Sequence, residues 1–225
     1  MEQQPKCAMC KVKPYKRACV SENGTGPREC PTITKSDAIK EATEKYNNPG
    51  IYEFARAASI QEAEGYINRD RVPFVKHPAK TRMEEIVEFA HRMNYKRLGL
   101  AFCSGLKSEA AVFQEYLEQS KFEVVSVICK VGCTPKERIG IEDHEKVKIS
   151  SFETMCSPIA QAELLNNAET EFNIVLGLCV GHDSLFFKHA NAYSTVFAVK
   201  DRVLGHNPLS ALYTINSYYE RLMKG

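Results

Sequence analysis

Nine cysteines carry most of the chemistry that this chain could perform. Four of them are grouped near the N-terminus, at Cys7, Cys10, Cys19 and Cys30. Three more each close an apolar run that is typical of a buried strand, at Cys103, Cys129 and Cys179. Cys156 lies directly before a Ser-Pro pair that indicates a helix start. Thiolates bind zinc and iron–sulfur clusters, so this pattern points to metal or cluster binding.

The N-terminal group has the spacing of a metal knuckle. Cys7-x2-Cys10 places two thiolates on one tight turn, and Cys19 and Cys30 complete a set of four. Four thiolates satisfy zinc in a closed tetrahedral site, and an iron–sulfur cluster accepts the same ligands. The spacing does not separate the two, although the Cys-Pro pair at position 30 resembles the end of some ferredoxin-type runs. The alternative is four unrelated free thiols.

The strand-end cysteines predict a second site. The carboxyl ends of parallel strands meet at one edge of a sheet, about 4.8 Å apart, so Cys103, Cys129 and Cys179 could share one cofactor. Cys156 precedes a helix N-terminus, where the helix dipole favours a thiolate. We expect an iron–sulfur cluster, with [4Fe–4S] first, because all-thiolate ligation suits it. Cys133 could replace one ligand. The alternatives are a reactive thiol pair, or cysteines that merely fill space in the core.

A group of polar residues follows Cys179, the last of the strand-end cysteines. Gly181-His182-Asp183-Ser184 opens a helix, whose free N–H groups would bind an anion beside Cys179. His182 could be a ligand, a proton donor or a cap partner, and Asp183-Ser184 could cap the helix. Lys200-Asp201-Arg202 follows the next strand and could bind a polar substrate at the same edge. The sequence has no Walker motif and no GxGxxG.

Three functional hypotheses follow from these residues. The first is a metal-binding protein, with an N-terminal four-cysteine site and a thiolate site at the sheet edge, that acts in redox chemistry, electron transfer or sensing. The second is an enzyme of small-molecule metabolism with Cys179 or Cys156 as the nucleophile and His182 as the base. The third is a zinc-knuckle adaptor that binds a partner or nucleic acid through its basic N-terminal residues.

Composition and charge narrow the cellular setting. The 225 residues carry a net charge of +2, which disfavours a general polyanion binder. No signal peptide is visible, and no apolar stretch approaches the roughly 20 residues that cross a bilayer. We therefore expect a cytoplasmic protein with reduced thiols and no membrane partner. The expected partners are a redox protein or a small anionic ligand, with nucleic acid disfavoured; the sequence does not give the oligomeric state.

The chain divides by pattern into three parts: a Cys-rich knuckle at 1–33, a helical segment at 34–95 and a Rossmann-like α/β domain at 96–225. Periodicity and capping signals in the middle part predict helices at 36–47, 51–68 and 83–93. In the last part, apolar runs predict strands at 97–103, 122–129, 172–179 and 194–200, with a short edge strand near 147–149. Helices are expected at 106–120, 157–168, from about 183, and at 209–223.

Apolar strands that alternate with helices predict an α/β fold. We expect a small doubly wound, mostly parallel sheet of about four to five strands with helices on both faces. In such a sheet, ligands bind in the crevice at the carboxyl ends of the strands. This is the edge at which the strand-end cysteines would meet.

Four stretches of sequence carry a family resemblance: KVGCTPKERIGI (130–141), CSPIAQAELLN (156–166), GLCVGHDSLFFKHA (177–190) and VKDRVLGHNPLSALY (199–213). Together with the Cys-rich N-terminus, they resemble an uncharacterised prokaryotic family described only as metal-binding, domain of unknown function family 1847. The resemblance implies metal binding and a single architecture for nearly the whole chain, with no known reaction. It implies functional positions without roles at Cys7, Cys10, Cys19, Cys30, Cys156 and Cys179.

Overall fold

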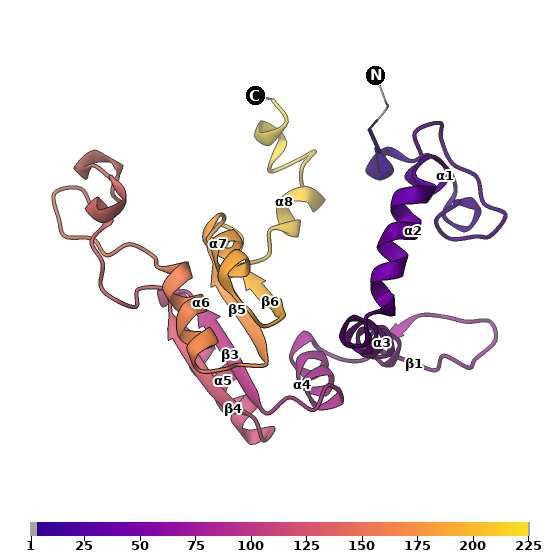
Figure 1. Ribbon diagram of the computed structural model, residues 1–225. Helices are drawn as coiled ribbons and strands as arrows, with labels where there is room; N and C mark the ends of the chain where they lie inside the picture. The colour runs from indigo at the N-terminus through magenta and orange to yellow at the C-terminus, as the bar shows by residue number, and fades with distance from the viewer. Residues whose placement is uncertain (1–3, 225) are drawn as a thin grey trace. The chain divides into compact units, whose positions relative to one another are not determined.

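The computed structural model describes residues 4–224, and the chain forms two compact units, Met1–Ala63 and Glu64–Gly225 (Figure 1). The boundary between the two units falls inside the segment that the sequence pattern marks as helical. Every helix among the described residues is too short or too polar to cross a lipid bilayer.

The first unit begins with an irregular, cysteine-bearing segment. It holds two 3-10 turns, Cys7–Met9 and Pro14–Lys16, and one isolated bridge between Arg17 and Thr25. The helices α1 (Pro31–Thr34), α2 (Ser36–Glu44) and α3 (Pro49–Glu64) follow, and a 3-10 turn at Lys45–Asn47 separates the last two. Between residues 4 and 56 no described residue is buried. The segment therefore lacks a hydrophobic core of its own.

The start of α3 explains a difference from the sequence prediction. Pro49 occupies the first helical turn, where its missing N–H is not needed, and the Asn48 side chain accepts hydrogen bonds from Gly50 and Ile51 at 3.0 and 3.2 Å. The helix therefore starts at Pro49 and not at Ile51, and it ends at Glu64, four residues earlier than predicted.

The second unit opens with a two-stranded antiparallel pair, β1 (Tyr66–Ile67) and β2 (His77–Pro78), which the sequence pattern did not predict. The next helix, α4 (Arg82–Arg92), starts at a capping box. The Thr81 side chain accepts a hydrogen bond from the Glu84 N–H, while the Glu84 carboxylate accepts one from the Thr81 N–H at 2.7 Å. The observed helix therefore differs from the predicted 83–93 by one residue at each end.

Four parallel strands form the main sheet: β3 (Arg97–Phe102), β4 (Glu123–Ile128), β5 (Phe172–Leu178) and β6 (Ser194–Val199). Their order is β4-β3-β5-β6, so the chain winds away from β3 first on one side and then on the other (Figure 1). The prediction of a mostly parallel α/β sheet is confirmed. The expected edge strand near 147–149 is wrong, since these residues form bends and a turn.

Helices cover the sheet. On one face, Ala162 and Leu165 of α6 (Pro158–Asn167) and Phe186 of α7 (His182–His189) pack against apolar strand residues that include Ala101 and Val175. Neighbouring strand residues point to the opposite face. Aromatic pairs also join other helices to the strands: Phe113 of α5 (Lys107–Gln119) stacks on Phe197 of β6 at 4.6 Å, and Phe89 of α4 lies 5.4 Å from Phe172 of β5.

The C-terminal helix is shorter than predicted. α8 spans Leu209–Tyr213 and is followed by turns and a 3-10 turn at Glu220–Leu222, whereas the sequence pattern predicted a helix over 209–223. Thr214 ends the helix with a backbone at φ −114° and ψ 20°. The residues that follow, Thr-Ile-Asn-Ser, have lower helix propensity than Ala or Leu. The side-chain oxygens of Thr, Asn and Ser compete for backbone hydrogen bonds, and Ile is β-branched.

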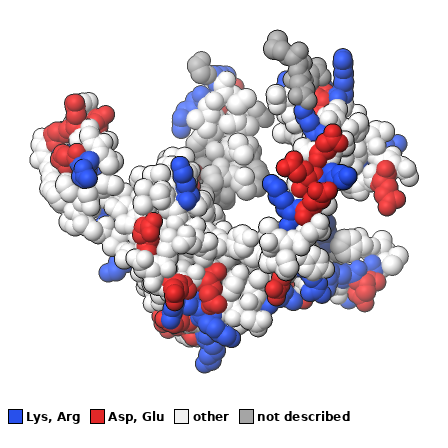
Figure 2. Space-filling view, in the orientation of Figure 1, with Lys and Arg blue, Asp and Glu red and all other residues white. Residues whose placement is uncertain are grey.

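A long excursion, residues 130–157, connects β4 to α6; we call it the rim loop. Its base is closed by a bridge between Pro135 and Thr154. Near its tip, the Lys146 ammonium lies 2.5 Å from a Glu137 oxygen and 3.2 Å from an Asp143 oxygen. Figure 2 shows the acidic side chains gathered on this loop. These ion pairs give the loop a defined shape without regular strands.

Candidate functional site

The three strand-end cysteines lie at the carboxyl edge of the sheet, each one residue beyond its strand. Cys103 follows β3, Cys129 follows β4 and Cys179 follows β5. The backbone hydrogen bonds between neighbouring strands continue into two of these cysteines. The Cys103 N–H donates to Leu176 O at 3.0 Å, and the Cys129 N–H donates to Phe102 O at 2.8 Å. β3 and β5 flank the point where the strand order reverses, which is where open α/β sheets bind ligands.

Cys129 contacts another thiol. Its Sγ lies 3.9 Å from the Sγ of Cys156. The Ser104 N–H, one residue beyond Cys103, donates to the same Cys129 Sγ at 3.3 Å. The sulfurs of Cys129 and Cys156 are therefore in contact, and Cys103 ends the neighbouring strand beside them. We call Cys103, Cys129, Cys156 and Cys179 the rim cluster.

Cys179 ends β5, the neighbour of β3, at the same edge of the sheet. The Arg202 guanidinium, in the turn after β6, donates to the Cys179 Sγ at 3.2 Å. This hydrogen bond is the largest cause that holds the pKa of the Arg202 guanidinium above its ordinary value. Arg202 is thus placed to neutralise a negative centre at the rim.

The rim loop delivers Cys156 to the cluster. The Ser157 N–H donates to Cys129 O at 2.7 Å, which sets the backbones of Cys156 and Cys129 side by side. One residue beyond Cys129, the Lys130 ammonium donates to Thr154 O at 2.5 Å. These two bonds tie the returning end of the loop to the end of β4. They explain how residues 27 positions apart reach contact.

Gln161 is a contributor that sequence reasoning missed. This fully buried side chain of α6 donates from Nε2 to Val127 O at 2.7 Å and to Phe102 O at 3.2 Å. It therefore ties together the ends of β3 and β4 just before Cys103 and Cys129. Its Oε1 has no hydrogen-bond partner among the described residues. The available signal was a glutamine between Ile159 and Leu165 on a helix that packs against apolar strands.

The thiols of the cluster differ in their readiness to ionise. The hydrogen bond with Cys129, together with burial, raises the pKa of Cys103 to about 12. The hydrogen bond from Cys129, helped by the nearby Lys130 charge, lowers the pKa of Cys156 to about 6 against the effect of its burial. At neutral pH the cluster therefore pairs a Cys156 thiolate with a protonated Cys103.

Cationic and imidazole groups border the cluster. The Lys200 side chain acts on the Cys103 thiol, and the charge of Lys130 acts on Cys156. His182 opens α7, and its pKa is lowered by burial and then by the Lys130 charge, so its ring is neutral at neutral pH. The expected cap by Asp183-Ser184 is wrong, since α7 begins at His182 after Gly181 and has no side-chain cap.

Cys133 lies apart from the rim cluster. Its side chain is exposed, and its Sγ lies 3.6 Å from the hydroxyl of Thr154. Its backbone has a φ of +48°, in the left-handed region where a non-glycine residue marks a tight turn. Cys133 thus has a local contact within the rim loop, and we do not include it among the four clustered thiols.

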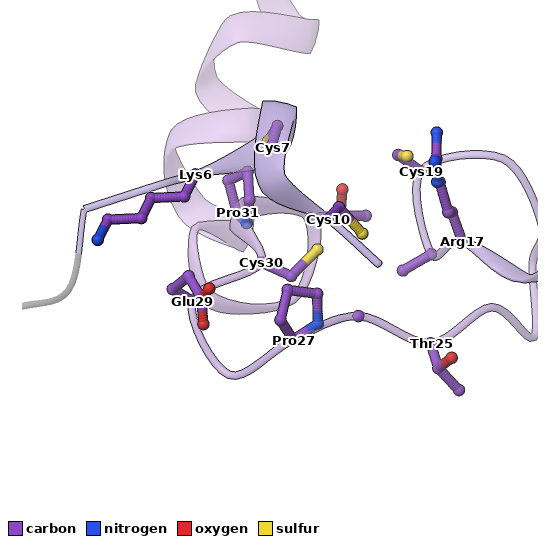
Figure 3. Close-up of a pocket in the computed structure, with 13 residues that line it drawn as sticks. Lys6, Cys7, Cys10, Arg17, Cys19, Thr25, Pro27, Glu29, Cys30 and Pro31 are labelled. Atoms are coloured by element: carbon purple, nitrogen blue, oxygen red, sulfur yellow. The ribbon is translucent and has the colours of Figure 1, made fainter. Parts of the chain in front are cut away.

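In the first unit, Cys7, Cys10, Cys19 and Cys30 all line one pocket (Figure 3). The view shows the Cys10 and Cys30 side chains directed toward the space between the first turn and the loop. Gly26 makes room there, since a Cβ at this position would lie 2.7 Å from the Cys30 Sγ. Across residues 4–224, however, no three Cys, His, Asp or Glu side chains form a group that could hold a metal ion, either here or at the sheet edge. A closed knuckle and a metal site at the rim cluster both stay predictions.

Comparisons with known proteins locate the chain in a family. The model of a family described as "Protein of unknown function (DUF1847)" matches residues 30–197, a range that contains the whole rim cluster and Gln161. The chain is 39% identical over 220 residues to the uncharacterized protein MJ0455 of Methanocaldococcus jannaschii, and the alignment covers 98% of this chain and 99% of that protein. No solved structure matches. Since the family model covers well over half of the sequence, the chain belongs to the DUF1847 family.

Proposed function

We propose that this protein binds a thiophilic metal centre at the rim cluster and uses it in redox chemistry, electron transfer or sensing. One observation carries the proposal: four cysteines from four separate segments lie at one sheet edge, beside the reversal of strand order, and the sulfurs of Cys129 and Cys156 are 3.9 Å apart. Cysteines that only filled space in the core would not need to share one edge.

The charges around the cluster support the proposal. A centre held by four thiolates is negatively charged and needs compensation at a half-buried sheet edge. Arg202 donates to the Cys179 sulfur, and the Lys130 and Lys200 side chains act on Cys156 and Cys103. Hydrogen bonds to ligand sulfurs are one of the means by which proteins tune the potential of such a centre. In this proposal, Arg202 is the residue that tunes it.

The metal that we propose first is an iron–sulfur cluster, [4Fe–4S], because the ligand set is entirely thiolate. The alternative is one zinc ion. Sulfurs bound tetrahedrally at about 2.3 Å from zinc lie about 3.8 Å apart, close to the 3.9 Å between Cys129 and Cys156. A cubane attaches each thiolate to a different iron and would spread this pair apart. Measuring the iron, sulfide and zinc content of the protein distinguishes the cluster from the zinc ion.

We propose a second metal site, for zinc or a cluster, at Cys7, Cys10, Cys19 and Cys30. Its support is the shared pocket, together with the lack of buried residues between 4 and 56. A segment without a core needs another source of folding energy, and structural zinc supplies about 10–16 kcal/mol in small domains. The two proposed sites lie in different units of the chain.

The test is metal analysis of the full chain purified without oxygen. We expect iron and sulfide in equal amounts with visible absorbance, or zinc without colour. The pair Cys129→Ser/Cys156→Ser should remove the rim metal only, the pair Cys7→Ser/Cys10→Ser should remove the N-terminal metal only, and Cys133→Ser should change neither. If the wild type contains no metal, or if the rim variant retains all of it, the proposal fails.

A nucleophilic enzyme is the second candidate, favoured by the lowered pKa and half-exposed position of Cys156. His182, which opens α7 at the same edge, is the base in this candidate. Under this candidate, peptide mapping of protein treated with iodoacetamide at neutral pH, after metal removal, should find Cys156 modified well before Cys103. Equal slow modification of both would eliminate it.

A further inference from the structure

Among the rim thiols, Cys129 and Cys156 are placed to bond with each other. Their sulfur atoms are 3.9 Å apart, and a disulfide requires about 2.05 Å, a gap that side-chain rotation can close. The backbones already lie side by side, because Ser157 donates to Cys129 O and Lys130 donates to Thr154 O. Bond formation therefore needs no rearrangement of the sheet or of α6.

The two thiols differ in access to solvent. Cys129 is 2% exposed, whereas Cys156 is only half-buried. A disulfide arriving from solution can reach the Cys156 sulfur and cannot reach that of Cys129. This difference assigns the roles in an exchange reaction: Cys156 is the attacking thiol and Cys129 is the resolving thiol.

The surroundings indicate the charge of the substrate. The Arg202 guanidinium donates to the Cys179 sulfur at 3.2 Å, and the Lys130 and Lys200 side chains act on Cys156 and Cys103. These cations would attract carboxylate groups on an approaching molecule. The rim therefore suits a small disulfide that bears negative charges.

We propose that Cys156 and Cys129 form a dithiol that reduces small anionic disulfides when the rim holds no metal. The Cys156 thiolate attacks one substrate sulfur, a Cys156–substrate disulfide forms, and one thiolate leaves. Cys129 then loses its proton to solvent and attacks the Cys156 sulfur, and the second substrate thiolate leaves. The protein loses two electrons as it gains the Cys129–Cys156 disulfide, and the substrate disulfide becomes two thiols.

This activity goes beyond the proposed metal site, although it uses two of the same sulfurs. A bound metal would occupy both thiolates, so exchange belongs to the metal-free form. Oxidation of the pair would conversely withdraw two ligands from the metal. The same two residues would thus couple metal occupancy to the redox state of small thiols.

The experiment uses the full chain, with metal content measured first. The protein is then treated with chelator and reductant, desalted without oxygen and mixed with oxidised glutathione, an anionic disulfide. Peptide mapping should find a Cys129–Cys156 disulfide, with two glutathione thiols released for each such bond. Cys129→Ser should accumulate glutathione on Cys156, Cys156→Ser should lose both products, and Cys133→Ser should behave as the wild type.

The proposal is overturned if the mapped disulfides exclude the Cys129–Cys156 pair, or if Cys129→Ser leaves Cys156 unmodified. The initial metal measurement distinguishes a failure of the proposed dithiol from a failure of the proposed metal site. A rim metal followed by no exchange would defeat the dithiol alone. Exchange in a protein that was purified without rim metal would defeat the proposed metal site alone.

Discussion

At the scale of single residues, the rim cluster depends on a few polar contacts that the positions of the cysteines do not reveal. The apolar runs placed Cys103, Cys129 and Cys179 at strand ends because strands end where buried apolar residues end. Cys156 reaches them through backbone bonds of the rim loop. Those bonds depend on the three-dimensional path of residues 130–157, so no local pattern in the sequence could predict the 3.9 Å contact.

Gln161 offers a test of how the cluster is positioned. Gln161→Met keeps the volume but removes the hydrogen bonds to Phe102 O and Val127 O. We expect the free energy of unfolding to fall by about 1–3 kcal/mol, because buried carbonyls lose partners. Urea unfolding of metal-free protein measures this.

The matched control for Gln161→Met is Gln114→Met on α5, whose side chain is partly exposed and bonds only within its helix. It should change stability by less than about 0.5 kcal/mol. A Gln161→Met protein as stable as this control would show that the bridge between β3 and β4 is dispensable.

At the scale of elements, the regular parts of the sheet were predictable and the irregular parts were not. Each of the four strands lies within one or two residues of its predicted range, because a buried parallel strand requires a continuous apolar run. The β1–β2 pair has only two residues per strand and leaves no pattern. The ion pairs of the rim loop join residues whose proximity only the fold establishes.

Substitution of Gly177 tests the importance of the irregularity in β5 that precedes Cys179. It lies at a register shift in β5 with φ +69°, and a Cβ would lie 2.1 Å from Leu106 Cδ1. Gly177→Ala should therefore combine backbone strain with a steric clash and cost about 2–4 kcal/mol in urea unfolding.

The control for Gly177→Ala is Gly140→Ala, where φ is +78° and no atom lies within 4 Å of the new Cβ. This substitution carries the backbone strain without the clash, so its cost should be about 1 kcal/mol. Equal costs at the two positions would mean that the clash at Gly177 does not exist.

The rim loop should open in acid. Hydrogen bonds and charge from Lys146 and Lys136, and from the backbone of Ser150, lower the pKa values of Glu137, Asp143 and Glu153. Carboxyls with lowered pKa values stabilise the fold above their unfolded values near 4, and the stabilisation is lost as the pH falls through the folded values. Hydrogen exchange of peptides within 134–155, corrected for intrinsic rate, should therefore accelerate below about pH 4.

A charge variant checks the acid prediction at neutral pH. Lys146→Ala removes the cation that pairs with Glu137 and Asp143, and it should accelerate exchange in the rim loop and leave β3 and β5 unchanged. Lys148→Ala, which removes no ion pair given by the structure, should leave the loop as in the wild type. Uniform protection of the loop in both variants and in acid would contradict the assigned role of these pairs.

At the scale of the whole molecule, the two units differ in what can hold them together. The second unit has a hydrophobic core around its sheet, whereas between residues 4 and 56 no described residue is buried. Chelator should therefore speed protease cleavage within residues 4–34 and leave the sheet intact, as read by mass spectrometry of the fragments. The Cys129→Ser/Cys156→Ser variant should respond to chelator as the wild type does, and identical cleavage with and without chelator would contradict an N-terminal metal site.

The most direct measurement is anomalous diffraction at the iron and zinc absorption edges from crystals of protein purified and grown without oxygen. We predict a strong peak at the sheet rim, within bonding distance of sulfurs from Cys129 and Cys156 and of at least one more thiol of the rim cluster. A map with no peak at this edge, and with these thiols separated by intervening side chains, would contradict it.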